Sequence, residues 1–509
     1  MEYSSLQCVA LCPTEKLLCK SFCDSTPKAT PAHDPVPTTH DAAVLWLAHV
    51  RLLPSNLLSL GASPHPVSSL TTMTTPRSQH VLIIGGGLAG PCLALSLAQH
   101  SIRSTIFEIC PTRSKAGGSI SLGPNALRVL DQYAGVYDRI RAAGFSYYRL
   151  GAYAEDGEKL GDTVAGEEDK GAKGYPAVRV LRSTLHKVLL DAGQEMSGLI
   201  DIKWGAEMSR IEESEEGVTA YFVDGSKVQG ERVLARPQTV MLLLNPFWQT
   251  PGDVMIVADG IHSKVRQHIL GSQAPTPIFD GLCIVNGFLP ASSAVTPNPD
   301  LTFPAFMFTR SGVFMTIPID AEAKTLAWGI NKHVKEHKRG EWRELERSGE
   351  VARLAKADYD NIHLQPLRSL LDNAEDKETK IWAPYSIPDL PTWHTPKVCL
   401  IGDAAHGLPP NGQGSTLAFQ DAALLTRLLI SRDTTSYDDM FSRFETIRRP
   451  HIERLRQSSK TFNVLKAKTG PWVWYLKKWA FRAFFWWNGG VVHHGKETDF
   501  DFDEVDLRA

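Results

Sequence analysis

The chain has 509 residues, with few cysteines and no long apolar run. Eight cysteines at this length are too few for a disulfide framework, which favours a reducing compartment. No apolar run reaches the roughly 18 to 20 residues of a membrane span. The N-terminus also lacks the basic start and apolar core of a secretory signal. We therefore expect a cytoplasmic protein without a spanning helix.

The sequence has no excess of charge of either sign. It contains 54 Lys and Arg against 56 Asp and Glu, a formal net charge of -2. This balance excludes a strong overall field that would gather nucleic acid, so ligands must be bound by local features. A content of 43% hydrophobic and 22% charged residues excludes a wholly disordered or multi-span protein. The length predicts about two to four domains.

A metal-binding spacing is absent as well. Cys8, Cys12, Cys19 and Cys23 follow the pattern C-x3-C-x6-C-x3-C, which matches no familiar zinc module, so we expect no metal site. These cysteines lie within residues 1–77, where prolines interrupt a stretch rich in Thr, His and Ala. This composition predicts a disordered segment before the first strand.

A glycine-rich loop is the first strong pattern. Val81–Ile84 is wholly apolar, as expected for a strand buried in a parallel sheet. The loop after this strand, GGGLAG, has the spacing G-x-G-x-x-G and leads into a predicted helix over residues 91–99. The N-terminus of such a helix attracts phosphates. Three glycines serve the tight turn, the approach of the backbone to a pyrophosphate and the close packing of the helix: Gly85, Gly87 and Gly90.

The next predicted strand, residues 104–108, ends in Glu108. An acidic side chain at this place is suited to accept hydrogen bonds from a ribose hydroxyl pair. Because strand, loop, helix and acid occur in this order, the pattern predicts dinucleotide binding. No second G-x-G-x-x-G follows, so we expect no separate nicotinamide-binding domain. Further strands are expected at 219–224, 254–258 and 398–401, an apolar helix at 418–430, and charged helices within 333–380.

Two further segments resemble motifs of a known family. Asp253–Ile269 reads DVMIVADGIHSKVRQHI, and Val398–Leu425 reads VCLIGDAAHGLPPNGQGSTLAFQDAALL. They are similar to the D-G and G-D motifs of the FAD-dependent aromatic hydroxylases, which include p-hydroxybenzoate and salicylate hydroxylases. The likeness extends over residues 73–456. It implies an α/β fold, in which a Rossmann-like FAD-binding domain contains an inserted mixed or antiparallel β-sheet substrate domain and is followed by C-terminal helices.

The expected domain order follows from this resemblance. The FAD-binding domain has two parts, residues 78–275 and 396–460, and the substrate-binding sheet at 276–395 lies between them. An aromatic and basic helix with a tail is expected at 461–509. Residues 231–252 are an atypical insertion, either a lineage-specific loop or sequence foreign to the functional protein, such as a translated unspliced stretch.

The G-D segment carries the candidate contacts to the flavin ring. Asp403 can accept a hydrogen bond from a ribitol hydroxyl. The next helix opens with four residues whose N–H groups can face the pyrimidine edge of the flavin: Gly412, Gln413, Gly414 and Ser415. The alternative is a strand-to-helix turn with a capping aspartate.

Other candidate contacts are distributed along the chain. The resemblance implies that Asp259 and Gly260 of the D-G segment contact FAD, and that Arg182 approaches its phosphates, for which a bidentate guanidinium is suited. Gly118 and Ser119 are expected beneath the flavin. The alternative for Arg182 is a surface helix residue. The cations of the D-G segment either receive a nicotinamide dinucleotide or form a solvated surface: His262, Lys264 and Arg266.

One position departs from the family pattern. Ile109 follows Glu108 at a place where an arginine is frequent in the family. We therefore expect the adenine side of the cofactor to be bound more weakly or supported differently.

The resemblance also implies a reaction. NADPH or NADH would dock transiently to reduce FAD, and a flavin C4a-hydroperoxide formed with O2 would hydroxylate a small hydrophobic substrate, aromatic or polyketide-like, in secondary metabolism. Arg310 and Tyr385 are the candidate catalytic residues, because a cation stabilises a phenolate and a phenol relays a proton. The alternatives are a solvated arginine and a packing tyrosine. Two other functions stay open: an epoxidase of an isoprenoid chain, and a flavin-binding protein disabled by the insertion.

Residues 471–487 contain five of the twelve tryptophans, interleaved with Lys477, Lys478 and Arg482. This mixture is suited to peripheral contact with a membrane surface, and it is too short and too charged to span a bilayer. The alternative is a helix packed on the FAD-binding domain or on a dimer surface. Both interpretations predict an ordered helix, and the oligomeric state stays open.

Overall fold

The computed structural model describes residues 79–113, 117–166, 174–196, 198–223, 247–375, 378–409, 412–431, 435–465 and 468–493, together with 500 and 507. The predictions for residues 1–77 and their cysteines, and for 231–246, lie outside this part. The chain divides into two units at residue 77, and all of the described residues belong to the unit from Ser78 onward.

A parallel sheet of five strands, together with the helices that cover it, forms one half of this unit. Its order is β20-β12-β1-β2-β8, and every neighbouring pair is parallel. Val81, Leu82 and Ile83 of β1 are almost fully buried, as expected for a strand covered on both faces. Four of its strands were predicted and are confirmed with these bounds: β1 His80–Ile84, β2 Arg103–Glu108, β12 Val254–Val257 and β20 Val398–Leu400. The fifth, β8 Ile200–Trp204 at the edge of the sheet, was not predicted from the sequence.

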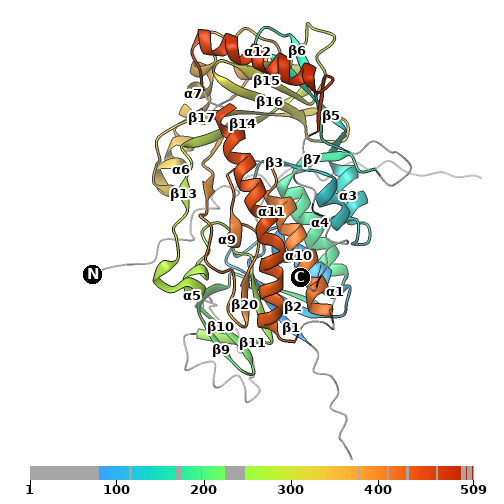
Figure 1. The fold of residues 1–509 in the computed structure, drawn as a ribbon, viewed down its shortest axis with the longest axis vertical. Helices are drawn as coiled ribbons and strands as arrows, with labels where there is room; N and C mark the ends of the chain where they lie inside the picture. Colours follow the sequence, from blue (N-terminus) through green and yellow to red (C-terminus); the bar gives the residue numbers. More distant parts are fainter. Residues whose placement is uncertain are drawn as a thin grey trace, which may run out of the picture. The chain divides into compact units, whose positions relative to one another are not determined.

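Helices cover this parallel sheet and pack against one another (Figure 1). The predicted apolar helix is α10, which packs on α1, α2 and α11. It is buried along most of its length because its side chains meet helices and sheet on several sides. The helices of this half are α1 Ala89–Ala98, α2 Pro124–Leu130, α3 Val136–Ala143, α4 Arg182–Glu195, α5 Arg266–Leu270, α9 Asp403–His406, α10 Gly414–Ile430 and α11 Tyr437–Leu465.

A mixed sheet of eight strands forms the second half. Its order is β18-β14-β17-β16-β15-β5-β6-β21, and all pairs are antiparallel except β15 with β5 and β6 with β21. The antiparallel sheet expected after residue 276 is confirmed. Its strands are β5 Arg149–Ala154, β6 Lys159–Val164, β14 Leu282–Pro290, β15 Ala305–Thr309, β16 Gly312–Pro318, β17 Thr325–His333, β18 Lys380–Trp382 and β21 Val491–His493.

The large sheet takes strands from separate parts of the chain. β5 and β6 precede the expected boundary at residue 276, and β21 follows residue 460, where the expected second part of the FAD-binding domain ends. Alternate residues of β15 belong to different cores: Met307 packs with the helices that follow β17, and Phe308 packs with the C-terminal helix. The helices on these two faces are α6 Arg339–Arg347, α7 Glu350–Asp358, α8 Leu367–Asp372 and α12 Pro471–Trp487.

Three smaller sheets complete the unit. They have the orders β3-β7-β4, β11-β10-β9 and β13-β19. β11, at the end of the atypical insertion, pairs antiparallel with β10 from Val218 opposite Gly252 to Val223 opposite Phe247. The bounds are β3 Ser119–Leu122, β4 Phe145–Tyr147, β7 Ala177–Leu181, β9 Glu207–Ser214, β10 Gly217–Val223, β11 Phe247–Gly252, β13 Ile278–Phe279 and β19 Tyr385–Ser386.

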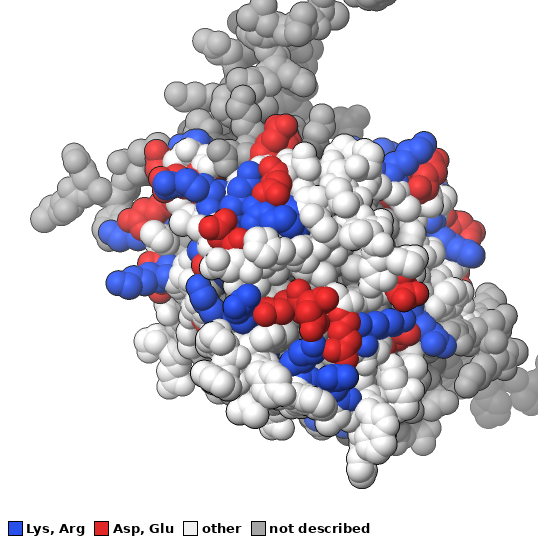
Figure 2. Space-filling model, turned by 90° about the horizontal axis from the view of Figure 1, so that it is seen from above, with Lys and Arg blue, Asp and Glu red and all other residues white. Residues whose placement is uncertain are grey.

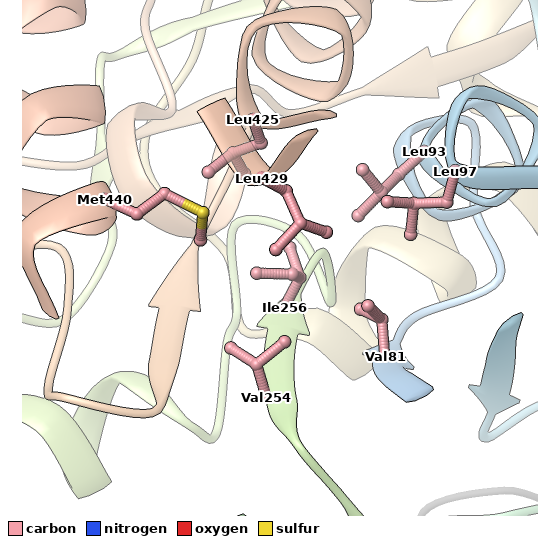
Figure 3. Close-up of a pocket in the computed structure, with 8 residues that line it drawn as sticks. All are labelled: Val81, Leu93, Leu97, Val254, Ile256, Leu425, Leu429 and Met440. Atoms are coloured by element: carbon pink, nitrogen blue, oxygen red, sulfur yellow. The ribbon is translucent and has the colours of Figure 1, made fainter. Parts of the chain in front are cut away.

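A small cavity lies between the parallel sheet and its helices (Figure 3). Side chains of β1, β12, α1, α10 and α11 line it, and all of them are apolar, among them Val81, Ile256, Leu425 and Met440. A space without polar groups offers no hydrogen bond to water or to a polar ligand. We therefore regard this cavity as a packing gap in the core and not as a functional site.

Candidate functional site

The motifs that the sequence separates by hundreds of residues meet at one edge of the parallel sheet. The glycine loop follows β1, Glu108 ends β2, the D-G segment follows β12, and the G-D segment follows β20. These four strands are consecutive neighbours in the sheet and all are parallel, so their carboxyl ends lie side by side. This edge is where open parallel sheets bind their ligands.

Two glycines of the loop are required by close backbone contacts. Gly85 has a φ of +108°, and a Cβ atom there would lie 2.3 Å from the carbonyl oxygen of Ala258 at the end of β12. A Cβ atom on Gly90 would lie 2.1 Å from the carbonyl oxygen of Gly85. Gly87 is different, because a Cβ atom there would meet only Nη2 of Arg182, at 3.7 Å. The loop is thus locked to the D-G strand, while Gly87 faces open space beside a cation.

Glu108 holds the glycine loop in position. Its carboxylate accepts a hydrogen bond from the N–H of Gly86 at 2.7 Å and another from the N–H of Cys110 at 2.9 Å. Each carboxylate oxygen keeps a second lone pair for a ligand. Ile109, where the family often has an arginine, is exposed.

Arg182 stands between two carboxylates at the first position of α4. Its N–H donates to the carbonyl oxygen of Gly118 at 3.0 Å, and its side chain packs against Gly117. Burial lowers the pKa of the guanidinium, although the carboxylates of Glu108 and Asp403 oppose this shift. A partly buried cation that faces both the glycine loop and the G-D segment is placed to meet a phosphate.

His186, one helical turn after Arg182, was not predicted from the sequence. Its Nε2 lies 2.6 Å from the carbonyl oxygen of Gly86, so the ring nitrogen donates a proton to this bond. Burial lowers the pKa of His186, which keeps the ring neutral. The spacing of four residues from Arg182 puts both side chains on one helix face and was the available signal.

The D-G segment contains one carboxylate with an unpartnered oxygen and one buried, hydrogen-bonded cation. Asp259 accepts a hydrogen bond from the N–H of Lys264 at 3.1 Å on one oxygen, while its buried Oδ1 has no partner among the described residues. Burial raises the pKa of Asp259. Arg266 is only 2% exposed and donates to the carbonyl oxygens of Ile261 and Ala404. Arg266 therefore joins the D-G and G-D segments and is not a solvated surface cation.

Asp403 opens the short helix α9 directly after β20. The side chain is exposed to solvent, yet protein surrounds it on most sides and raises its pKa, against the opposing effect of His406 and Arg182. A Cβ atom on Gly414 would lie 3.7 Å from Oδ1 of Asp403, so the carboxylate stands beside the N-terminus of α10. Gly412 and Gly414 are exposed there. The first N–H groups of α10, which have no acceptor within the helix itself, and a carboxylate acceptor thus lie beside one another.

A buried ionic network supports this turn from behind. Asp421 of α10 accepts hydrogen bonds from the N–H of Gly402 and from His406, both at 2.8 Å, and from Nε of Arg448 at 2.8 Å. Asp421 and Arg448 are fully buried. Burial alone would raise the pKa of Asp421, but His406 and Arg448 outweigh it and lower this pKa to about 2. The sequence contained these residues within the G-D segment and α11, but no spacing rule linked them.

The edge of the parallel sheet that carries the motifs approaches the large sheet near Gly118. A Cβ atom on Gly118 would lie 3.9 Å from the side-chain oxygen of Asn286 on β14. Ser119 begins β3 and accepts a hydrogen bond from Arg179 at 3.0 Å. Burial lowers the pKa of Arg179 to about 10. A ligand placed above this loop would therefore lie between the edge of the parallel sheet and the large sheet.

The two candidate catalytic residues lie in different places. Tyr385 on β19 contacts His262 of the D-G segment, with ring centroids 5.5 Å apart, and burial raises its pKa. Arg310 lies in the turn between β15 and β16, where it pairs with Glu155 and contacts the chain just before α12. The structure brings Tyr385 toward the edge of the parallel sheet where the motifs meet, but it does not bring Arg310 there.

The residues present fit a dinucleotide. The unpartnered oxygen of Asp259, the open space at Gly87 and the exposed N-terminus of α10 offer acceptors, a close backbone approach and N–H donors at one edge. Arg182 adds a cation between them. No cluster of His, Cys, Asp or Glu suited to a metal ion occurs in the part of the chain that the structure describes.

Comparison with known proteins identifies this arrangement. A family model described as "FAD binding domain" matches residues 78–238 and 252–459. The chain is 27% identical over 385 residues to a 3-amino-4-hydroxybenzoate 2-monooxygenase of Streptomyces platensis, which covers 75% of this chain and 86% of that protein. It is 24% identical over 404 residues to a 6-hydroxynicotinate 3-monooxygenase of Pseudomonas fluorescens. That match covers 78% of this chain and 94% of the other protein.

Salicylate hydroxylase of Pseudomonas putida is 26% identical over 423 residues, with 74% of this chain and 83% of that protein covered. Among solved structures, HpxO of Klebsiella pneumoniae complexed with FAD and uric acid has a TM-score of 0.60 at 20% identity. That match covers 80% of this chain and 93% of the other. At this identity the likeness concerns the fold.

Proposed function

Because this chain belongs to the FAD-dependent aromatic hydroxylase family, we propose that it is a single-component monooxygenase that uses NADPH or NADH as the hydride donor. The overall reaction balances as substrate, O2, NAD(P)H and one proton giving hydroxylated substrate, water and NAD(P)+. FAD, when bound, supplies the acceptance of hydride and the activation of oxygen. The protein's part is to bind and orient the cofactor and to exclude water.

The observation that supports this proposal best is the meeting of Arg182 and Asp403 at the edge of the parallel sheet. We propose that Arg182 and the N-terminus of α1 hold the phosphates, with Gly85, Gly87 and Gly90 allowing the close approach. Glu108 would accept hydrogen bonds from the ribose. Asp259 and Gly260 would contact FAD from the end of β12.

The ring end of the cofactor would lie at the G-D segment. Asp403 would bind a ribitol hydroxyl, while the exposed start of α10 would face the pyrimidine edge through Gly412, Gln413, Gly414 and Ser415. The positive end of a helix favours negative charge that develops on the ring during reduction. Gly118 and Ser119 would approach the ring from the opposite side, beside Asn286.

The substrate would lie between this ring and the large sheet. Its proposed chemistry, hydrophobic and aromatic or polyketide-like, agrees with the aromatic side chains around Tyr385, namely Phe279, Trp342 and His262. Tyr385 is the proposed proton relay, since a partly buried phenol with a raised pKa stays protonated and can donate. Arg310 is occupied by Glu155 at another place, so this position does not support a role on the substrate.

Two other functions predict different measurements. An epoxidase of an isoprenoid chain would consume NADPH with prenyl compounds and not with phenols. A flavin-binding protein disabled by residues 231–252 would contain flavin but consume no NADPH with any substrate. Against the second, β12 directly follows the insertion and keeps its register with β1 from Val81 opposite Val254 to Ile84 opposite Val257.

The test is a flavin absorption spectrum of the purified full chain, followed by a screen for oxygen-dependent NADPH and NADH oxidation. We expect bound flavin, and phenolic or polyketide-like compounds that accelerate NAD(P)H oxidation with formation of a hydroxylated product. A protein purified with flavin that forms no product with any aromatic compound would contradict the hydroxylase proposal. Tyr385→Phe should lower the rate of hydroxylation and leave the flavin content unchanged.

A further inference from the structure

Helix α12 lies on the large sheet at the end of the unit far from β1 (Figure 1). Three of its aromatic side chains are buried against β5, β6, β15 and β16: Trp474, Phe481 and Phe485. Gly161 of β6 permits the contact, because a Cβ atom there would lie 2.3 Å from the ring of Phe485. The helix is therefore seated on the sheet along a defined face.

Ion pairs fix the rotation of the helix about its axis. Lys478 pairs with Asp156 and with Glu158, the second at 2.8 Å, and Arg482 pairs with Glu158 at 2.9 Å. After α12 the chain returns as β21, which pairs with β6 from Val491 opposite Asp162 to His493 opposite Val164. The helix is thus tied to the sheet along one flank and at its C-terminal end, and the face opposite the buried one points outward.

The outward face of α12 is apolar and strongly exposed. Trp472, Trp486 and Trp487 are 84%, 79% and 83% exposed. The other large apolar side chains on this face are also mostly exposed: Val473, Tyr475, Leu476, Trp479 and Phe484. We call these eight residues the aromatic ridge. Exposed apolar surface of this size marks a site of interaction.

The ridge has a regular geometry. Trp472, Trp479 and Trp486 are seven residues apart, so they form a line along the helix. With about 100° per residue, the ridge covers roughly half of the circumference. The three cations of α12, including Lys477, lie on the flanks between the ridge and the buried face, and the helix contains no acidic residue. Figure 2 shows charges of both signs on this end of the molecule, in groups separated by broad uncharged surface.

We propose that the aromatic ridge is a docking surface for a lipid bilayer, with α12 lying parallel to the membrane plane. Tryptophan and tyrosine prefer the boundary between headgroups and acyl chains, where one side of the ring is apolar and the other is polar. Cations on the flanks of such a helix stand at headgroup level. From the ridge to the flanks, α12 changes from apolar to charged, as a bilayer does from its acyl chains to its headgroups.

A second copy of the chain fits the ridge less well. A pair of helices buries a narrow seam, as in a coiled coil, whereas this ridge is about half a circumference wide. Pairing along the three aligned tryptophans would leave Val473 and Phe484, on the far side of the ridge, uncovered. One continuous apolar medium covers all eight residues together. No helix in the part of the chain that the structure describes is long and apolar enough to cross a membrane.

The ion pairs also predict how the contact depends on charge. Lys478 and Arg482 are engaged by Asp156 and Glu158, which lie directly beside them. Their positive charge is therefore largely compensated within the protein. We infer that binding depends on aromatic insertion more than on anionic lipid, and that it changes little between low and high salt.

The test uses the full-length protein with its flavin and vesicles of phosphatidylcholine, alone or mixed with phosphatidylserine. Flotation measures the bound fraction, and tryptophan emission reports insertion by a shift to shorter wavelength. Wild-type protein should float with both kinds of vesicle, in low and high salt. The variant W472S/W479S/W486S should lower the partition coefficient by roughly tenfold or more, because the exposed rings supply the apolar area that the bilayer buries.

A matched control is Trp382→Ser, since Trp382 is 54% exposed but lies on β18, away from α12. The control should bind vesicles as the wild type does, and flavin content should be equal in all three proteins. Light scattering after gel filtration measures the oligomeric state. A wild-type protein that does not bind vesicles would overturn the proposal. Loss of a dimer in the triple variant, without vesicle binding by the wild type, would instead identify the ridge as a contact between copies.

Discussion

Nε2 of His406 lies 2.8 Å from Oδ2 of Asp421, and both side chains are almost completely buried behind the turn that presents Asp403. The same carboxylate also accepts from the N–H of Gly402, directly before Asp403. The position of Asp403, a proposed cofactor contact, thus depends on buried residues behind it. Arg448 of α11 completes the network on the other oxygen.

The first prediction concerns the free energy of unfolding of Asp421→Asn. This change leaves the guanidinium of Arg448 buried without a counter-charge, which costs about 3 to 5 kcal/mol in comparable buried pairs. We expect a loss of that order in denaturant unfolding, together with weaker flavin binding. Asp439→Asn, which weakens a partly exposed ion pair with Arg443 on α11, is the control and should change stability much less. Equal stability of D421N and the wild type would contradict the role of the network.

The second prediction concerns the loss of folding stability at acid pH. Burial and the nearby Arg448 lower the pKa of His451 to about 3, and neither ring nitrogen has a partner among the described residues. An unfolded histidine has a pKa of about 6.5, so the unfolded state binds the proton first. Stability contributed by neutral His451 is present above about pH 6.5 and is lost as the pH falls toward about 3.

His451→Phe should therefore flatten the decline of unfolding free energy between about pH 6.5 and pH 5. Urea unfolding at a series of pH values measures this slope. The exposed His363→Phe is the control and should keep the wild-type slope. Asp421 acts at lower pH, because its pKa is about 2 in the fold against about 3.9 when unfolded, so its contribution is present above that range and lost below it. A wild-type slope in H451F would show that another group controls acid unfolding.

The third prediction concerns Arg182 and flavin affinity. A hydrogen bond to a charged group contributes about 1.5 to 3 kcal/mol, so Arg182→Met should weaken FAD binding by roughly 10- to 100-fold. Arg182→Lys should bind FAD with an affinity between those of the wild type and Arg182→Met, since lysine keeps the charge but loses the planar fork of the guanidinium. Titration of the apoprotein with FAD, followed by fluorescence, gives the dissociation constants. Lys187→Ala, an exposed change on the same helix, should bind FAD as the wild type does. Unaltered affinity in R182M would remove Arg182 from the phosphate site.

The fourth prediction separates backbone conformation from steric contact in the glycine loop. Gly85→Ala meets both a φ of +108° and a carbonyl oxygen at 2.3 Å, and we expect an insoluble or flavin-free protein. Gly198→Ala has a φ of +87° but nothing within 4 Å, so it should cost only about 1 to 2 kcal/mol. The flavin content and the thermal unfolding of the two variants measure these effects. A G85A protein that retains flavin would show that β12 can move away from the loop.

Sequence motifs with fixed spacing predicted the edge of the parallel sheet well. The glycine loop, Glu108, Asp259 and Asp403 each follow an apolar strand, and parallel strands bring such positions together. The buried network could not be predicted in the same way, because Asp421 and Arg448 belong to different helices and their pairing depends on how α10 and α11 pack. Arg266 illustrates the opposite difficulty, since a cation in a polar segment looks solvated until its carbonyl partners are known.

The large sheet was predicted only in part for a related reason. Strands after residue 276 have the alternation and composition of a sheet, but nothing local indicates that β5 and β6 extend the same sheet. Arg310 was chosen from its place beside a strand. The turn that holds it points toward Glu155, which could be known only from the pairing of β15 with β5.

The pairing of β10 with β11 has a practical consequence for engineering. Val223 stands opposite Phe247, so the chain leaves one strand and re-enters its neighbour across a single strand spacing of about 5 Å. Two chain ends at this distance can be joined by a short hairpin turn or by a whole guest domain. This junction is therefore the natural place to graft a fluorescent reporter, or to build a shortened enzyme.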